Sequence, residues 1–591
     1  MKPLICIWAV PGHDVCAYVY YDDKTYYLPF ANFFDLKHYD FRYHSQDSTI
    51  NDVLDEIQKQ FGIENDYDTF LIRGGMYIKR GDDRAWFPSV DKQIFERTRR
   101  ELNLTGAGDM RQVKHENLFV SEIENFKHHD AHAICGYVQS PFKKSLVMTY
   151  DGTGDAEVAG LYSFNEENYF RYYDKHYDDF NVVGFYSQVG QFLPTICKSF
   201  GKEYDDIADL IYRLSKEQLD YAGKLMGLSA YGKKFDRKTE ELYDELRNLY
   251  RVAKFSYLIS YYKPTHIQLN EHLENERDKK AWRFLRIKGL INAIIQQKDE
   301  DIAYMYQRTF ESEVISHVCE NLERIKEHDN NLVLSGGGAL NVLANEKIKE
   351  VFPWINVYVP PNPGDEGLGL GFISYYLREQ NGYWPKFKVN QNLLGPLVHD
   401  FDEVDLIIGQ RSHKVIDIFE LVDILKKGEI VGLIQERLEI GPRALGFRSI
   451  LCDPSFPDMK DKLNSKVKFR EWFRPFAPVC NKEDASTYFE SNNFENLECM
   501  SFAPVVKEEY REKLSSITHV DNTSRLQTVT REENSLLHHI LKVFDGVLLN
   551  TSLNVQGKPI CNRLSDGLKV LDNTGLDHLV ILHNNRLYCF E

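Results

Sequence analysis

The pattern of hydrophobic and polar positions predicts a group of strands at the start of the chain. Three runs rich in β-branched and aromatic residues, LICIWAV, VCAYVYY and TYYLPFA, are separated by the polar turns PGHD and DDK. Such runs, broken by turn residues, are typical of strands joined as hairpins. We therefore expect three strands between residues 4 and 31.

Later hydrophobic runs end in glycine-rich or acidic turns. The segment SLVMTYDGTGD (145–155) is predicted as a strand with a turn, and residues 330–350 and 357–377 each have the pattern strand, turn, helix. Ligands of α/β sheets bind at strand ends, where loops expose backbone N–H groups and helix N-termini. The pattern predicts an α/β fold with a ligand site at these turns.

The middle and the end of the chain have other patterns. Residues from about 160 to 330 are mainly helical in pattern, so we expect a helical insertion that shapes a substrate cleft. Residues 381–397 are rich in Pro, Gly and Asn and are predicted to be a linker, after which residues 429–454 restart with a strand. A chain of 591 residues is too long for one core. We place domains at 1–390 and 391–591.

Composition narrows the class of protein. With 43% hydrophobic and 27% charged residues, the chain is expected to be globular throughout. It has no apolar run near the ~20 residues that cross a bilayer and no signal-peptide layout, so we expect a cytoplasmic protein without a membrane partner. Ten cysteines are scattered without CxxC pairs, which argues against a zinc ribbon or a disulfide framework.

The net charge of -17 opposes nonspecific binding to DNA or to anionic membranes. Contact with nucleic acid is therefore expected only through a local patch. KKAWRFLRIK (279–288) interleaves basic and aromatic residues, although an amphipathic helix with Trp282 and Leu285 facing inward also explains it.

Three histidines interrupt the apolar segment KHHDAHAICGY (127–137). On a helix, residues four apart share a face, so His128 and His132 can reach one ion while His129 points elsewhere. A zinc protease needs Glu directly after the first His, and here His129 and Asp130 follow, which argues against that class. Histidine pairs at this spacing also occur without a metal. Both interpretations stay open at this point.

Two strand-end acids complete a candidate metal site. Asp151 begins DGTGD, and Asp365 lies in NPGDEG. Together with His128 and His132 they would form a site of two histidines and two carboxylates. Mixed nitrogen and oxygen ligation suits Fe(II), Mn(II) or Zn(II), which the sequence does not distinguish.

Glycines beside these acids suggest phosphate binding, because glycine lets the backbone approach a phosphate closely. A plain tight turn is the alternative for DGTGD. SGGGALN precedes a helix and suits the sugar and phosphates of a nucleotide. The candidate residues are Gly152, Gly154, Gly336, Gly337, Gly338 and Asn341.

The second half of the chain carries a set of cations near apolar strands. Because buried, unpaired guanidinium groups are costly, the set indicates a polyanionic ligand. The alternative is that each cation pairs with one of the 89 acidic residues. Ser552 and Asn554, in NTSLN, follow a strand and offer polar groups beside such a ligand. The cations are Arg443, Arg448, Lys468, Arg470, Arg474 and Arg525.

Taken together, the motifs resemble those of one family, the NodU/CmcH-type O-carbamoyltransferases. The resemblance covers nearly the whole chain and rests on HHDAH, DGTGD, GKLMGLSAYG, SGGGALN, NPGDEGLGLG, GPRALGFRSILCDP, FREWFRPFAP and NTSLNVQGKPI, in this order. It implies an N-terminal domain similar to tRNA threonylcarbamoyl transferase, with the actin-like ATPase (ASKHA) fold and a helical insertion. It implies a YrdC-like α/β domain, similar to threonylcarbamoyl-adenylate synthase, at the C-terminus.

The resemblance also implies a reaction. The C-terminal domain would convert carbamoyl phosphate and ATP, with Mg²⁺, to carbamoyl-adenylate, and the N-terminal domain would transfer the carbamoyl group to a hydroxyl. The implied metal ligands are His128, His132, Asp151 and Asp365, with Fe(II) as the first expectation and Mn(II) or Zn(II) as alternatives. The implied binding residues are Arg443, Arg448, Lys468, Arg474, Arg525 and Ser552 with Asn554, and among them Lys468 and Arg474 are the catalytic candidates.

An alcohol needs a base beside it, and His13 or Asp14 in the PGHD turn is our candidate. A turn residue that caps the hairpin is the alternative for His13. The chain departs from the family at Glu436, where glycine is common, and at Tyr221-Ala222, where an acid is common. Residues 15–120 match nothing specific and are expected to select the acceptor.

The sequence argues against two other functions. A hydrogenase maturation factor would add an acylphosphatase domain and CxxC zinc fingers, which this sequence lacks. An actin-like ATPase acting as a chaperone or scaffold, with a C-terminal binding domain, would not need the cation set with SxN. The acceptor itself is not readable: a natural product, a sugar and a hydroxymethyl nucleobase in DNA are the candidates, and a homodimer is left open.

Overall fold

A computed structural model gives the fold of the chain. Within the part of the chain that the structure describes, no helix combines the length and the apolar character needed to span a membrane. The described residues are 4–9, 16–29, 68–73, 77–80, 83–86, 112–115, 118–121, 127–154, 157–172, 182–190, 193, 195–196, 221–253, 286, 289–294, 296–398, 400, 403–435 and 437–591.

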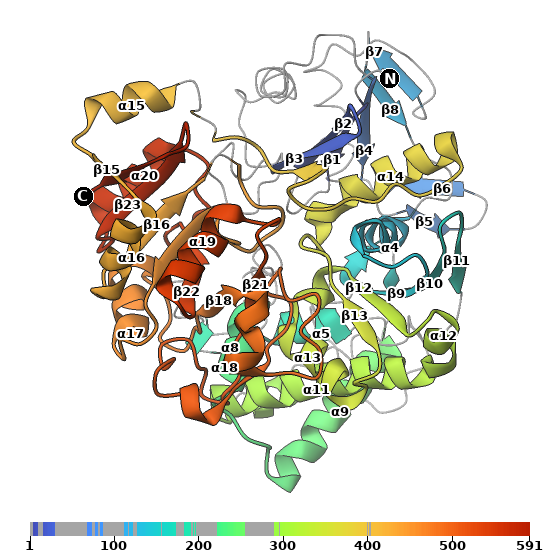
Figure 1. Cartoon of the computed structure of the whole chain (residues 1–591). Helices are drawn as coiled ribbons and strands as arrows, with labels where there is room; N and C mark the ends of the chain where they lie inside the picture. Colours follow the sequence, from blue (N-terminus) through green and yellow to red (C-terminus); the bar gives the residue numbers. More distant parts are fainter. Residues whose placement is uncertain are drawn as a thin grey trace, which may run out of the picture.

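The first layer is a seven-stranded mixed sheet (Figure 1). Its strands, in spatial order, are β14 (Leu393–Leu394), β3 (Lys24–Pro29), β2 (Cys16–Tyr21), β1 (Leu4–Ala9), β4 (Asp68–Arg73), β8 (Leu118–Ser121) and β7 (Gln112–His115). The three predicted N-terminal strands are confirmed, because β1, β2 and β3 pair antiparallel, with Leu4 opposite Tyr20 and Cys16 opposite Pro29. A separate small hairpin joins β5 (Tyr77–Arg80) and β6 (Asp83–Trp86).

The second layer is a five-stranded sheet. Its strands, in spatial order, are β11 (Tyr169–Tyr172), β10 (Glu157–Phe164), β9 (Ser145–Gly154), β12 (Asn331–Ser335) and β13 (Asn356–Tyr358). The two predicted strand–turn–helix units are confirmed. After β12 come the 3-10 turn η5 (Gly337–Leu340) and helix α13 (Val342–Val351), and after β13 come η6 (Asp365–Gly367) and α14 (Leu368–Asn381).

Two helices fill the space between these sheets. Helix α4 (His128–Gln139) packs against β9 and β12, α14 packs against β1 and β2, and the two helices contact each other. Ala131, Ile134, Cys135 and Val138 of α4 belong to the apolar core between the sheets. Every residue of α4 is buried, so its histidines lie in the interior of the protein.

A helical segment covers the other face of the five-stranded sheet. Side chains on a strand alternate between the two faces, so neighbouring residues of β9 join different cores. Leu146 and Met148 of β9 join the core on that side, whereas Val147 joins the core around α4. The segment begins later than the predicted residue 160, since residues up to Tyr172 complete the sheet. Its helices are α5 (Val182–Gly190), α8 (Tyr221–Ser229), α9 (Arg237–Ala253), α11 (Asp299–Glu320) and α12 (Leu322–Glu327).

The C-terminal part is built on an eight-stranded mixed sheet. Its strands, in spatial order, are β15 (Lys414–Ile416), β24 (Arg586–Phe590), β23 (His578–His583), β16 (Val431–Ile434), β17 (Arg448–Cys452), β22 (Leu548–Ser552), β18 (Ala477–Asn481) and β21 (Gln527–Val529). The strand predicted after the linker is β16. Together with the two sheets before it, this makes the chain an α/β protein.

Helices cover both faces of this sheet. α16 (Ile418–Lys426) and α19 (Ser535–Phe544) share one core with Val431 and Leu433, and α20 (Leu564–Asn573) lies on the other side with Ile434. Shorter elements complete the part: α15 (Val404–Gln410), α17 (Met459–Leu463), the π-helical turn η8 (Asn464–Lys468), η9 (Lys482–Asp484), α18 (Ala485–Tyr488), η10 (Glu508–Tyr510) and the β19 (Phe489–Glu490) and β20 (Val505–Val506) pair.

The segment predicted as a linker is anchored to the N-terminal part. Trp384 and Phe387 are buried, and β14 pairs with β3 so that Leu393 lies opposite Thr25. In Figure 1 the C-terminal sheet, coloured orange to red, lies beside the two earlier sheets, and the green helical segment runs below. The two parts are in contact, since a Cβ atom at Gly441 would meet Pro361 and one at Gly227 would meet Pro475.

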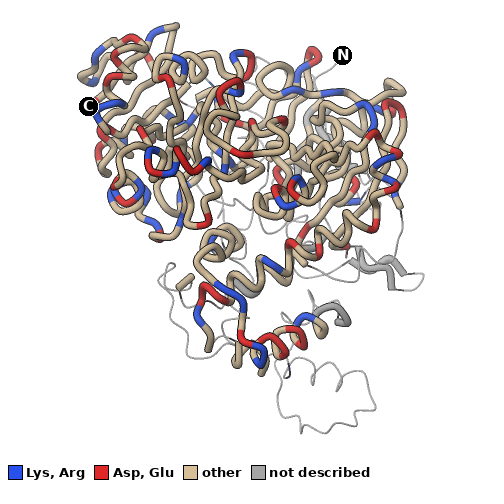
Figure 2. The backbone as a smooth tube through the Cα atoms, turned by 60° about the horizontal axis from the view of Figure 1, so that its bottom comes forward, with Lys and Arg blue, Asp and Glu red and all other residues tan. Residues whose placement is uncertain are grey.

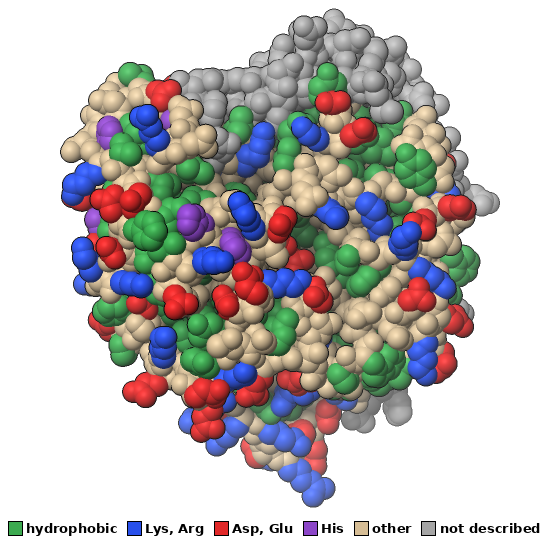
Figure 3. Space-filling model, in the orientation of Figure 1, with side chains coloured by type: hydrophobic (Ala, Val, Ile, Leu, Met, Phe, Trp, Pro, Cys, Tyr) green, Lys and Arg blue, Asp and Glu red, His purple; other side chains and the backbone are tan. Residues whose placement is uncertain are grey.

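Within the part of the chain that the structure describes, charged residues of both signs are distributed along the backbone (Figure 2). On the face shown in Figure 3, basic and acidic side chains are mixed rather than gathered into separate areas.

Candidate active site

The histidine helix α4 starts in a network of buried ion pairs. The backbone N–H of Lys127 donates to the Asp130 carboxylate at 3.0 Å, which satisfies a free donor at the helix start. Arg171 of β11 lies 3.5 Å from Asp130 and also pairs with Glu157 of β10. These contacts tie the first turn of α4 to the β10–β11 hairpin.

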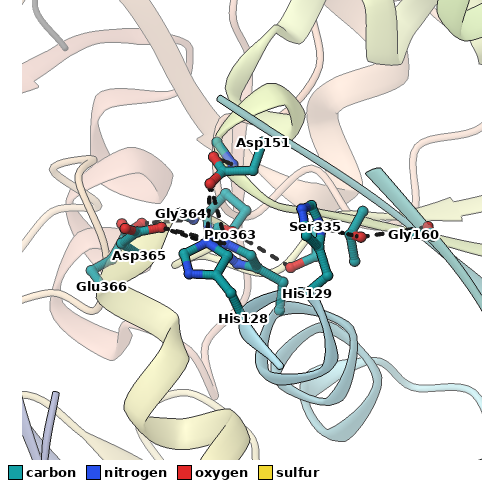
Figure 4. A network of polar contacts seen from close by, with 12 residues as sticks. His128, His129, Asp151, Gly160, Ser335, Pro363, Gly364, Asp365 and Glu366 are labelled. Atoms are coloured by element: carbon teal, nitrogen blue, oxygen red, sulfur yellow. Dashed lines mark hydrogen bonds and ion pairs between the residues drawn. The ribbon is translucent and has the colours of Figure 1, made fainter. Parts of the chain in front are cut away.

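His128 and His132 lie one turn apart on α4 and meet Asp151 of β9 and Asp365 of η6 (Figure 4). The Nε2 atom of His128 lies 3.0 Å from Asp151 Oδ2 and 3.4 Å from Asp365 Oδ1. The Nε2 atom of His132 lies 3.9 Å and 3.4 Å from the same two oxygens. One atom from each residue lies within 4.8 Å of all the others. The structure brings the four predicted metal ligands together.

The SGGG turn holds the Asp151 carboxylate in place. The N–H of Gly337 donates to Asp151 Oδ1 at 3.2 Å, which leaves Oδ2 directed at the histidines. Gly336 has φ of +85°, and a Cβ atom there would lie 2.2 Å from the carbonyl oxygen of Tyr150, so this position requires glycine. The N–H of Gly336 donates to Pro363 O at 2.7 Å, which links the turn to the loop before Asp365.

The carboxylates set the charge of this cluster. Burial disfavours a proton on His128, but Asp365 and Asp151 outweigh burial and hold its pKa well above the ordinary value. Burial likewise opposes a proton on His132, whose pKa the same carboxylates raise. Burial would raise the pKa of Asp151, yet its hydrogen bonds to both histidines hold that pKa well below the ordinary value. The half-buried Asp151 and the buried Asp365 therefore require cationic partners.

A divalent metal ion fits this donor set. The two Nε2 atoms lie 3.0 Å apart, a distance at which two imidazoles share one hydrogen atom or direct their lone pairs at one ion. Two imidazoles with two carboxylates form a mixed site suited to Fe(II), Mn(II) or Zn(II). His129 is not part of the set, because its Nδ1 lies 2.8 Å from Thr149 Oγ1 on the adjacent strand.

The glycines after Asp151 differ from their predicted placement. The DGTG sequence is the end of strand β9 rather than a turn after it, and Gly154 pairs with Glu157. At Gly152, open space surrounds the position that a Cβ atom would take. The backbone beside Asp151 thus belongs to the end of the central strand of this sheet.

The structure gives the contacts of Asn341 but not those of the predicted base. The Asn341 side chain accepts the Ala344 N–H at 3.1 Å, which caps α13, and it also bonds to Gln307. It is therefore engaged in a buried network below the SGGG turn. His13 and Asp14, the candidates for the base, lie outside the described residues.

In the C-terminal part, Lys468 contacts the SxN pair, Ser552 and Asn554. Its ammonium donates to Ser552 O at 2.7 Å, to Ser552 Oγ at 3.2 Å and to Asn554 O at 2.9 Å, and it also contacts Asn554 Oδ1. Ser552 Oγ donates to Asn554 Oδ1 at 2.7 Å. The buried Lys468 is thus fixed at the end of β22.

Four arginines are close enough to repel one another's charge. Burial, and then Arg474, lowers the pKa of Arg443 to about 10, with Glu366 opposing the shift. Burial lowers the pKa of Arg525 well below its ordinary value, and Arg443, Arg470 and Arg474 add to this. Cations held this close favour an anionic ligand between them, because such a ligand relieves the repulsion.

Arg448 is not one of these four arginines, and its hydrogen-bond partners are backbone carbonyls. It is fully buried, and its Nη1 donates to Arg437 O at 3.0 Å and to Phe447 O at 3.0 Å, and contacts Gln435 O as well. Burial lowers its pKa to about 10, with Glu439 opposing the shift. Arg448 therefore supports the loop that carries Arg443.

The two clusters lie on either side of one junction. Gly441, which precedes Arg443 by two residues, has φ of +87°, and a Cβ atom there would lie 2.0 Å from Pro361 O. The loop of Arg443 therefore touches the loop that leads to Asp365. Glu366, the neighbour of Asp365, acts electrostatically on Arg443.

Three residues that contribute to these clusters do not stand out in the sequence: Glu366, Arg171 and Glu471, of which Glu471 lies 3.7 Å from Arg474. Glu366 and Glu471 lie inside motifs that were recognised, so their acidic character within those motifs was the available signal. Arg171 gave no such signal, because its partners Asp130 and Glu157 lie 41 and 14 residues away in the sequence.

Family models of carbamoyltransferases match the chain in two places. The model of the carbamoyltransferase N-terminus matches residues 63–372, and that of the C-terminus matches residues 422–586. The chain belongs to the carbamoyltransferase family. This confirms the family, and the enzyme class, that the motifs predict.

Curated relatives of this carbamoyltransferase agree with the assignment. Nodulation protein NolO of Bradyrhizobium diazoefficiens is 29% identical and covers 77% of this chain and 77% of its own length. The 3'-hydroxymethylcephem-O-carbamoyltransferase of Streptomyces clavuligerus is 31% identical over 62% of this chain and 64% of its own. Among solved structures, full-length HypF in a phosphate- and nucleotide-bound form covers 63% of this chain and 54% of its own, with 15% identity and a TM-score of 0.27, too low to support an argument.

Proposed function

We propose that the protein is an ATP-dependent O-carbamoyltransferase that works in two steps at two sites. Membership of the carbamoyltransferase family supports the transfer of a carbamoyl group. The observation that carries the two-step scheme is the pair of clusters at one junction, one of arginines with Lys468 and one of histidines with carboxylates. Each cluster suits a different half of the reaction.

In the first step, the C-terminal part forms carbamoyl-adenylate. Carbamoyl phosphate loses its phosphate to water, the oxygen of the resulting carbamate attacks the α-phosphorus of ATP, and pyrophosphate leaves with Mg²⁺. Arg443, Arg474 and Arg525 hold the phosphates, because their mutual repulsion is relieved only by anions. Lys468, fixed by Ser552 and Asn554, places a further positive charge where negative charge develops.

In the second step, the acceptor oxygen attacks the carbamoyl carbon, the bond to AMP breaks and the hydroxyl proton passes to a base. His128, His132, Asp151 and Asp365 would hold a divalent ion, with Fe(II) first among the candidates and Mn(II) or Zn(II) next. When bound, such an ion supplies Lewis-acid polarisation of a phosphate or carbonyl oxygen. We assign the approach of the AMP phosphate to the turn of Gly336, Gly337 and Gly338 with Gly152 and Gly154, and the role of the base to His13 or Asp14.

The proposed architecture assigns one step to each part of the chain. Residues 1–390 are an actin-like (ASKHA) domain with a helical insertion, and residues 391–591 are a YrdC-like domain. The stacking of two sheets around α4 and α14, with helices on the outer face of the second sheet, supports the first assignment. Keeping both sites in one chain shelters a mixed anhydride that water would destroy.

The proposed acceptor group is a hydroxyl. One relative is named for a hydroxymethyl group on a cephem, which supports a primary alcohol as the acceptor. The candidates are a natural product, a sugar and a hydroxymethyl nucleobase, the last of which would make the reaction a DNA modification.

Pyrophosphate release tests the first step directly. The protein is incubated with ATP, Mg²⁺ and carbamoyl phosphate, and we expect pyrophosphate to appear only when carbamoyl phosphate is present. Lys468→Met should abolish the release, whereas Lys569→Met, at a side chain that is 70% exposed, should not. ATP hydrolysis to ADP without dependence on carbamoyl phosphate would instead support an actin-like ATPase that serves as a scaffold.

Removing a metal ligand separates the two steps. In Asp365→Asn we expect less bound transition metal per chain, measured by elemental mass spectrometry, and loss of carbamoyl transfer to an alcohol, detected as a mass gain of one carbamoyl group. Pyrophosphate release should persist, because Asp365 lies in the other cluster. Loss of both steps together would contradict the division of labour.

A further inference from the structure

The helix α8 of the helical segment docks directly on the loop that carries two of the clustered arginines. We call residues 470–475, REWFRP, the arginine loop. A Cβ atom at Gly227 of α8 would lie 3.5 Å from Pro475 and 3.7 Å from Phe473, so the helix backbone packs against the loop. Just after α8, the ring of Tyr231 meets Trp472 edge-on with centroids 4.9 Å apart. The GKLMGLSAY motif therefore serves as a docking face for this loop.

A buried ion pair lies at the centre of this contact. The ammonium of Lys224 on α8 lies 2.6 Å from Glu471 Oε1 in the arginine loop, and the two side chains are only 5% and 8% exposed. The other carboxylate oxygen of Glu471 lies 3.7 Å from an Nη atom of Arg474. Burial would raise the pKa of Glu471, but Lys224, and then Arg474, hold that pKa below its ordinary value. The carboxylate is thus ionised and shared unequally between the two cations.

Glu471 is a potential competitor for the substrate. It is an anion inside a group of cations that includes Arg470 and Arg474, both of which it influences electrostatically. A carboxylate in such a place can pair with arginine in a bidentate manner, and a phosphate would have to displace it. The close contact with Lys224 draws the carboxylate toward the helical segment instead.

We infer that Lys224 is a positioning residue that keeps Arg474 available for the anionic substrate by holding Glu471 away from it. The inference rests on the proposed function, because it assigns the arginine loop to phosphate binding. It also makes the helical segment, a part of the N-terminal half, a determinant of substrate affinity in the C-terminal half. This gives the GKLMGLSAYG motif a role in addition to packing.

The test uses charge removal and a compensating second change. In Lys224→Met, Glu471 has only the arginines as partners and should form a closer ion pair with Arg474. The KM for ATP or carbamoyl phosphate in pyrophosphate release should then rise about tenfold, which corresponds to the loss of one charge-assisted hydrogen bond to the substrate. The change in kcat should be smaller. In the double variant Lys224→Met/Glu471→Gln no carboxylate competes, so KM should return to within about twofold of the wild-type value. Lys224→Arg should keep the wild-type KM, because it keeps the positive charge.

Compensation separates this role from a purely structural one. If Lys224 only stabilised the junction, removing its partner as well would not restore KM, so a double variant as impaired as Lys224→Met overturns the inference. An unchanged KM in Lys224→Met overturns it too. Lys224→Gln, which keeps a hydrogen-bond donor, is the second variant if Lys224→Met does not fold. Lys234→Met, 65% exposed and just beyond the motif, is the matched control and should behave as wild type.

A binding measurement distinguishes failure of this inference from failure of the proposed function. Inorganic pyrophosphate is titrated into each variant by calorimetry, which requires no turnover. Weaker binding in Lys224→Met, restored in the double variant, supports the inference even if the wild type releases no pyrophosphate from ATP. Equal binding in all variants refutes it, even if the carbamoyl reaction proceeds as proposed.

Discussion

A methyl group at Gly371 would push the helix α14 away from the histidine helix α4. A Cβ atom there would lie 2.1 Å from the carbonyl oxygen of Ala131 and 2.9 Å from its Cα atom. A carbon atom normally stays roughly 3.3 Å or more from such an oxygen, so the helices must separate by about 1 Å. Ala131 directly precedes His132, so the displacement reaches a proposed metal ligand.

Two opposing effects set the size of the loss. Alanine in place of glycine within a helix stabilises by about 0.5–1 kcal/mol, because glycine loses more backbone freedom on folding. Overpacking a tight contact costs about 1–3 kcal/mol, and here the obstacle is a backbone carbonyl that no rotamer change removes. We expect Gly371→Ala to lower the unfolding temperature. Ligand positions must hold to about 0.2 Å, so metal affinity should fall at least about tenfold.

The assay compares Gly371→Ala with Gly409→Ala. Gly409 also lies in a helix, α15, but a Cβ atom there meets no atom within 4 Å. In the control, the alanine should therefore only add its higher helix propensity, so Gly409→Ala should unfold at or above the wild-type temperature. Metal affinity is measured by competition with a chelator, and unfolding by circular dichroism. If Gly371→Ala binds metal and unfolds as Gly409→Ala does, the close packing of α14 on α4 is not what fixes the histidines.

Two further variants test the electrostatics of the fold. The ammonium of Lys386 donates to the carbonyl of Tyr137 at 2.7 Å and to that of Phe142 at 2.8 Å, near the end of α4. Lys386→Met should therefore lower the free energy of unfolding by about 2–4 kcal/mol, measured by thermal unfolding. Lys143→Met, at a side chain that is 82% exposed, should leave it almost unchanged. Burial, and then Glu533, raises the pKa of Glu498 to about 7, so the folded state retains a proton that the unfolded state releases above about pH 4.3, and stability falls from that pH up to about pH 7. The free energy of unfolding of Glu498→Gln should therefore exceed that of the wild type by up to about 3 kcal/mol at pH 8 and equal it at pH 4.3. A difference that does not depend on pH would contradict this sign.

The sequence predicted much of the local structure because the signals were local. The strand–turn–helix patterns around SGGGALN and NPGDEG contain their own turn residues, and both units have the predicted order. The i, i+4 spacing of His128 and His132 placed both on one helix face, as the structure has them. The prediction of a turn at DGTG was wrong, because glycines also continue a strand when a partner strand, here β10, pairs with them. The linker prediction at 381–397 missed the burial of Trp384 for a similar reason: pairing and packing partners are distant in the sequence.

By itself, the sequence determined the α/β class, the carbamoyltransferase family, the candidate ligand types and the helix that carries two of them. Only the tertiary structure decided that Asp151 and Asp365, from two separate strand ends, face those histidines, and that the loop of Arg443 touches the loop of Asp365. It alone paired Lys224 with Glu471, which lie 247 positions apart by their residue numbers. The physical reason is that helices, turns and caps are set by interactions between neighbours in the chain, whereas charge pairs and metal sites depend on which sheet faces and loops the packed core brings together.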